Sequence, residues 1–204
     1  MSIIDVIKDN IKWNVDNPIV RMFYNNLLTS KNSFVEMIGS HNKLMSLSPE
    51  ELLELTDGKE GQDGVRRGGI NGLFQKVFWI AGYNGIEKWK YSLVVDKANT
   101  GTFKLIAMPV TSTEDADFIK NNTIELLDFS NKFDDEGKLN LSIEDANAIL
   151  YNLMVDNNGE PRERKGYNTS FAQVQVSRSV VNHANGVFTK KEEGNLTSEQ
   201  KEKM

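Results

Sequence analysis

Two arginines and two glycines stand directly before an apolar segment, in the run GQDGVRRGGINGLF. The spacing of apolar residues predicts that a helix starts at Ile70. The first amide groups of a helix favour anions, and glycines let a phosphate approach the backbone closely. The run therefore predicts a phosphate-binding site, although it lacks the Gly-Lys-Ser/Thr order of a P-loop and follows no predicted strand. The alternative is a solvated loop between helices. The four candidate ligand-binding residues are Arg66, Arg67, Gly68 and Gly69.

Acidic residues gather in one part of the chain. Between Ser112 and Asp145 there are ten acidic residues and three lysines, a net charge of −7, whereas the whole chain carries −5. Such a surface attracts a basic partner and raises the rate and specificity of association. The alternative is the solvated face of two helices, because helix first turns favour acids. The candidate protein-contact residues are Glu114, Asp115 and Asp117.

The sequence gives little support for metal, cysteine or histidine chemistry. Cysteine is absent, which excludes disulfides, thiolate metal sites and cysteine nucleophiles. Residues 133–145 superficially resemble a calcium loop, but Leu139 stands where the sharp turn needs glycine, and Asp145 replaces the bidentate glutamate. His41 and His183 match no metal spacing, and no serine lies in a G-x-S-x-G elbow. We therefore predict no cofactor, no metal and no catalytic residue, and we expect that the chain is not an enzyme.

The aromatic residues and the overall charge argue against nucleic-acid binding. Trp79, Trp89 and Tyr91 could stack on bases, but their positions on an apolar helix and on the apolar face of a strand predict core packing. His41 falls on the apolar stripe of its segment, which predicts a core or boundary position. An acidic chain without a basic stripe neutralises phosphates poorly, so nucleic acid is an unlikely partner.

Capping signals predict three helices in the first third of the chain. Asn17 and Pro18 form an N-cap and first-turn pair ahead of apolar residues at helical spacing. Ser33 and Glu36 form a capping-box pattern that predicts one helix through Met45. The same pattern returns over residues 48–51, ahead of three leucines. These apolar stripes need a partner surface.

The remaining elements predict an α+β fold in a single domain. A polar loop over 57–69 leads into a helix over 70–81 that Gly82 closes. Residues 89–95 and 103–107 alternate with period two around a turn, which predicts an antiparallel hairpin. The last elements are a helix over 112–133 capped by Ser112, a helix opened by Ser142 and Asp145, and a further strand over 172–176. The domain spans residues 1–188, and a polar charged tail occupies 189–204.

No motif assigns an activity, so the function is a choice between hypotheses. The leading one is a non-enzymatic structural or assembly subunit that contacts copies of itself or other subunits. The high asparagine and lysine content with four prolines suggests a phage virion component. One alternative is a protein that binds a phosphorylated small molecule or nucleotide through residues 66–69. The other is an acidic inhibitor of a host protein.

The sequence predicts neither a signal peptide nor a membrane span. Acidic and basic residues interrupt the first apolar positions, and no later stretch approaches the roughly 20 apolar residues of a membrane span. We therefore expect neither secretion nor a membrane partner, and a cytoplasmic or virion location.

Overall fold

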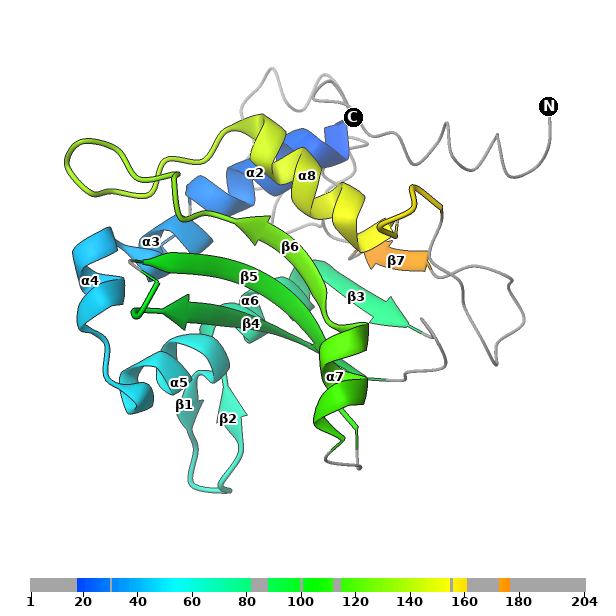
Figure 1. Ribbon diagram of the computed structural model, residues 1–204, viewed down its shortest axis with the longest axis horizontal. Helices are drawn as coiled ribbons and strands as arrows, with labels where there is room; N and C mark the ends of the chain where they lie inside the picture. Colours follow the sequence, from blue (N-terminus) through cyan, green and yellow to red (C-terminus); the bar gives the residue numbers. More distant parts are fainter. Residues whose placement is uncertain are drawn as a thin grey trace, which may run out of the picture.

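The computed structural model describes residues 18–29, 31–81, 88–99, 101–111, 115–154, 156–160 and 173–176. Helices come first along the chain and antiparallel strands follow in the middle, which confirms the predicted α+β class (Figure 1). Asn17, Gly82, Ser112 and the tail over 189–204 lie outside the described residues, as does most of the loop that precedes the last strand.

Four helices open the described chain. They are α2 (Pro18–Leu28), α3 (Phe34–Ile38), α4 (His41–Ser46) and α5 (Pro49–Asp57). The predicted single helix through Met45 is wrong, because Gly39 takes a φ of 73° and ends α3, and Ser40 then caps α4 by accepting a hydrogen bond from the Lys43 amide. The start of α5 is as predicted, with both hydrogen bonds of the capping box between Ser48 and Glu51.

The predicted polar loop contains a short hairpin. Its strands are β1 (Lys59–Glu60) and β2 (Arg66–Arg67), which pair antiparallel. Next comes α6 (Gly69–Val77), and the predicted continuation of this helix to residue 81 is wrong. Residues 78–81 instead form β3 (Phe78–Ala81), because they pair with β7 (Gln173–Val176), the predicted last strand. This pairing across the chain overrides the helical spacing of the apolar residues.

The main sheet has the order β4-β5-β6 within the described residues. The predicted hairpin is confirmed as β4 (Trp89–Asp96) and β5 (Thr102–Pro109). The predicted helix over 112–133 is wrong, since a short α7 (Ala116–Asn122) is followed by β6 (Ile124–Asp128). The register between β5 and β6 shifts at Leu105/Ile106, which leaves an extra residue on β6. Leu126 and Leu127 are therefore both buried, and the strand does not alternate.

One face of this sheet carries the core. Aromatic rings from several elements meet there, and Phe74 of α6 stacks on Tyr91 of β4 at 5.2 Å. The last helix, α8 (Ile143–Met154), forms as predicted and packs beside β6. In Figure 1, α2, α6 and α8 lie behind or above the sheet and α7 crosses one end of it. Among the described residues, no helix is long and apolar enough to cross a membrane.

Candidate functional site

The hairpin that carries the predicted arginine site, residues 58–69, projects from the body of the protein. Lys59 pairs with Arg67 and Glu60 with Arg66, and every residue from 59 to 68 is exposed. Figure 1 shows β1 and β2 extending away from the main sheet below α5. The two arginines therefore lie on a protrusion, and the predicted solvated loop between helices contains a paired hairpin.

Two glycines let the base of the hairpin close. Gly58 has a φ of 81°, and a Cβ atom added there would lie 1.9 Å from the carbonyl oxygen of Arg67. A Cβ atom added at Gly69 would lie 2.8 Å from the carbonyl oxygens of Leu55 and Thr56. The first residue of α6 therefore packs against the last turn of α5. Carbonyl groups at the negative end of one helix thus lie close to the positive end of the next, where the sequence predicted an anion.

Both guanidinium groups bind acceptors of the hairpin itself. Arg67 forms a bidentate pair with Asp63, with N···O distances of 3.1 and 2.7 Å, and Arg66 donates to the Gly58 carbonyl oxygen at 2.9 Å. The hydrogen bond from Arg67 lowers the pKa of Asp63, and the same bond raises the pKa of Arg67. These contacts tie the two strands and the turn together, so the arginines brace the hairpin.

An open pocket of about 380 Å³ lies beside the hairpin. Lys43, Lys59 and Arg67 contribute positive charge to its lining, and Glu51 and Glu54 contribute negative charge. Lys43 Nζ donates to the Met37 carbonyl oxygen at 2.9 Å, and Lys59 lies 3.6 Å from Glu54. An anion bound here would compete with these acceptors. Of the four predicted ligand-binding residues, Arg67 and Gly69 line this pocket and Arg66 and Gly68 do not, and phosphate binding stays a prediction.

Two of the three predicted protein-contact acids, Asp115 and Asp117, lie at the exposed start of α7. Asp115 is the N-cap, and its carboxylate accepts hydrogen bonds from the amides of Asp117 and Phe118. Asp117 is exposed, whereas Glu114 lies outside the described residues. The helix buries no residue completely. These acids are accessible to a basic partner, and their contact with one stays a prediction.

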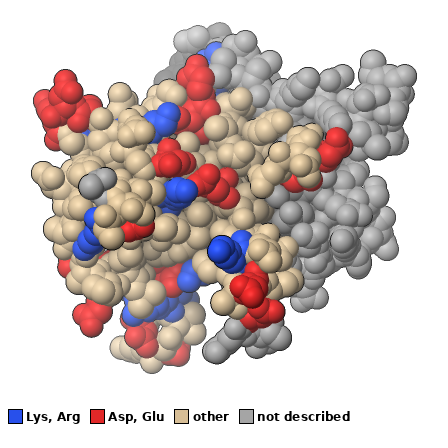
Figure 2. Space-filling model, in the orientation of Figure 1, with Lys and Arg blue, Asp and Glu red and all other residues tan. Residues whose placement is uncertain are grey.

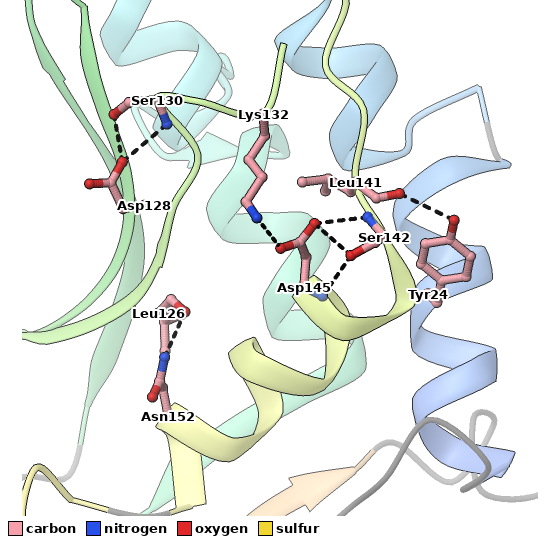
Figure 3. Close-up of polar contacts among 9 residues, drawn as sticks. All are labelled: Tyr24, Leu126, Asp128, Ser130, Lys132, Leu141, Ser142, Asp145 and Asn152. Carbon is pink, nitrogen blue, oxygen red and sulfur yellow. Dashed lines mark hydrogen bonds and ion pairs between the residues drawn. The ribbon is translucent and has the colours of Figure 1, made fainter. Parts of the chain in front are cut away.

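Other acids of the same segment are used within the fold, as Figure 3 shows. Asp128 accepts hydrogen bonds from the amide and the hydroxyl of Ser130, at 3.0 and 2.5 Å, and the hydroxyl contact is the main cause that lowers its pKa. Asp145, which is buried, accepts from the amide and hydroxyl of Ser142 and pairs with Lys132 at 2.8 Å. The segment is therefore less available to a partner than its count of charges predicted.

The loop that superficially resembled a calcium site is a turn. Asp134 accepts hydrogen bonds from the amides of Glu136 and Lys138, and Gly137 has a φ of 78°. Asp145 points to Lys132, as described above. Within the described ranges, no group of three or more histidine, cysteine or acidic residues could hold a metal ion.

The aromatic residues and the first histidine lie where core packing predicted them. Trp89 and Tyr91 are buried, and burial raises the pKa of the Tyr91 hydroxyl. His41 is half-buried and makes edge contacts with Phe103 and Phe133, both with centroids 5.3 Å apart. The Trp79 side chain and His183 lie outside the described residues.

Side-chain amides cover parts of both edges of the sheet, which the sequence reading missed. On β4, the Tyr91 amide donates to Asn71 Oδ1 at 2.9 Å, and Gln75 Nε2 donates to the Trp89 carbonyl oxygen at 2.7 Å. On β6, Asn152 Nδ2 donates to the Leu126 carbonyl oxygen at 2.9 Å (Figure 3). The signal that could have revealed the contacts on β4 is the pair Asn71 and Gln75, two amide residues four apart on the otherwise mostly apolar helix α6.

Comparisons of this chain with protein-family models, with curated proteins and with solved structures found no match.

Proposed function

We propose that this chain is a non-enzymatic structural or assembly subunit that acts through contacts with other proteins, either copies of itself or other subunits. One observation carries the proposal. Arg66 and Arg67 brace a protruding hairpin in which residues 59–68 are all exposed. A braced protrusion presents fixed side chains to a partner and loses little conformational freedom when it binds. A phage virion component is the finer form of this proposal, and it is supported only by the composition.

Light scattering of the full chain tests this proposal. The mass is measured over a concentration series, alone and with candidate partner proteins, and we expect a mass above that of the monomer in at least one condition. A strict monomer in every condition contradicts the proposal.

A hairpin variant then tests whether the protrusion takes part. Asp63→Ala removes the acceptor of Arg67 and loosens the turn, so we expect weaker association with an unchanged fold by circular dichroism. Glu136→Ala is the matched control, because its carboxylate forms an exposed pair with Lys138 at 3.7 Å on another turn. Equal association of the two variants would exclude the hairpin from the contact.

The second candidate is a protein that binds a phosphorylated small molecule, favoured by the pocket that Arg67, Lys43 and Lys59 line. A thermal-shift screen with inorganic phosphate, nucleotides and sugar phosphates tests it. A ligand at 100 times its dissociation constant adds about 2.7 kcal/mol of stability. The double variant Arg66→Ala, Arg67→Ala should abolish the shift, and a shift that survives in the variant would remove this candidate.

A further inference from the structure

The outer face of the main sheet is open to solvent at its centre. Alternate residues of β4 and β5 point into the core, so the residues between them point outward. Figure 1 shows this face toward the viewer, with the described helices behind the sheet, beside it or at its end. We define the outer face by the residues at these outward positions and their partners on β6: Lys90, Ser92, Val94, Lys104, Ile106, Met108, Glu125 and Asp128.

This face combines a small apolar centre with charges of both signs. Ile106 lies between Ser92 and Glu125 in the register, and Val94, which is 39% exposed, lies opposite Lys104. Lys104 pairs with Glu125 at 2.7 Å, and both side chains remain accessible to solvent. Figure 2 shows basic and acidic side chains next to one another over the sheet, with uncharged surface around them. A face that carries both signs of charge can pair its charges with those of a second copy.

The amide contacts at the edges of the sheet make strand addition there less favourable. At these points an incoming strand would have to displace Asn71 and Gln75 from β4, or Asn152 from β6, because each of these side chains already binds an outward backbone group there. The outer face carries no such obstacle to a second copy.

We propose that a second copy of this chain docks on the outer face about a twofold axis, so that Lys104 of each copy faces Glu125 of the other. In a twofold interface the same patch meets itself, so ion pairs can form across it only if the patch carries both signs of charge. Lys104 and Glu125 supply both signs: each copy gives up its internal ion pair, and two pairs form between the copies, so the number of ion pairs is unchanged. The apolar centre is small, so association is weak and salt-sensitive. This inference rests on the proposed function and names one contact that would serve it.

Charge-swap variants of the full chain test the contact. Sedimentation velocity over a concentration series measures self-association of the wild type, of Lys104→Glu and of Glu125→Lys. Each variant alone places like charges opposite one another, so we expect self-association to weaken by about tenfold or more. A mixture of the two variants places opposite charges together again, so we expect mixed dimers at near wild-type affinity. A purely structural effect of either substitution would not produce this recovery.

Val94→Glu gives a second probe that does not involve the ion pair, and Leu53→Glu is its control because Leu53 is 42% exposed on α5. We expect Val94→Glu to abolish self-association and Leu53→Glu to leave it unchanged. If Val94→Glu self-associates as strongly as the wild type, the outer-face contact is overturned. The same holds if the mixture of Lys104→Glu and Glu125→Lys forms no mixed dimers. Either result leaves the proposed function standing. A wild type that is monomeric alone also overturns the contact, and only a monomer with every partner overturns the proposed function.

Discussion

The carboxylate of Asp145 joins the start of α8 to the loop after β6, and its removal tests how strongly the fold depends on that contact. The side chain is 8% exposed. One oxygen accepts hydrogen bonds from the Ser142 amide at 2.8 Å and from the Ser142 hydroxyl at 3.0 Å, and the other pairs with Lys132 at 2.8 Å (Figure 3). Three contacts are therefore lost together in Asp145→Ala.

The expected loss of stability follows from how exposed each partner is. A helix cap contributes about 1 kcal/mol, and a hydrogen bond to a charged group contributes roughly 1.5–3 kcal/mol. Breaking a fully buried pair costs about 3–5 kcal/mol, but Lys132 is 38% exposed and can turn into solvent once its partner is gone. We therefore expect Asp145→Ala to lower the free energy of unfolding by about 2–4 kcal/mol, and Asp145→Asn by about half of that, because the amide oxygen still accepts from Ser142.

The stability that the Asp145 carboxylate contributes must depend on pH. Burial raises the pKa of Asp145, but the hydrogen bonds from Lys132 and Ser142 together lower it by more, so the pKa lies below its ordinary value of 3.8. A carboxyl group with a lowered pKa in the folded state stabilises the protein above its unfolded pKa. This contribution is lost as the pH falls through the folded pKa. The difference between wild type and Asp145→Asn should therefore shrink below about pH 4.

Urea unfolding followed by tryptophan fluorescence measures both the loss of stability in the Asp145 variants and its dependence on pH. The midpoints of wild type and the two variants are compared at about pH 7 and about pH 3. Glu136→Ala is the control, because its carboxylate is 78% exposed in its pair with Lys138, and its midpoint should stay at that of the wild type. Equal midpoints for Asp145→Ala and wild type at neutral pH, or a difference that does not shrink in acid, would refute this reasoning.

Two further predictions concern the hairpin base and the sheet edge. Gly58→Ala should cost about 2 kcal/mol more than Gly64→Ala in urea unfolding, because both positions have a positive φ but only Gly58 would meet a carbonyl oxygen at 1.9 Å. Equal costs would show that the hairpin base can open. Gln75→Leu should cost about 1–3 kcal/mol in thermal unfolding, since it leaves the Trp89 carbonyl oxygen without the Gln75 donor. Asn71→Leu should, for the same reason, speed hydrogen exchange at the Tyr91 amide, and an unchanged exchange rate would argue against this edge contact.

Local signals predicted the helices that begin with a capping box. Ser48 with Glu51, and Ser142 with Asp145, each form reciprocal hydrogen bonds at the start of a helix, and this chemistry lies within four residues. The end of a helix was harder to predict. Gly39 stops α3 by taking a positive φ, and the only local signal for this break is the serine that follows it and caps α4.

The strands that were missed depend on partners far along the chain. In β6 the bulge buries Leu126 and Leu127 in succession, which breaks the alternation that identifies a strand and left a spacing that looked helical. In β3 the backbone pairs with β7, about a hundred residues later, and local spacing carries no trace of that pairing. The hairpin of β4 and β5 was predictable because its partner lies next to it and its buried residues alternate strictly.

The candidate site shows why charged residues are harder to place than apolar ones. Arg66 and Arg67 precede a helix, so the sequence pointed to an anion at the helix start. The contact that decides their role is the pair between Arg67 and Asp63, four residues apart across a tight turn. Gly58 and Gly69 let the ends of two helices meet at the base of the hairpin that carries this pair. An arginine near a helix start is therefore available to a ligand only if no acid on the same turn pairs with it. Whether such a pair can form depends on the backbone conformation of the turn.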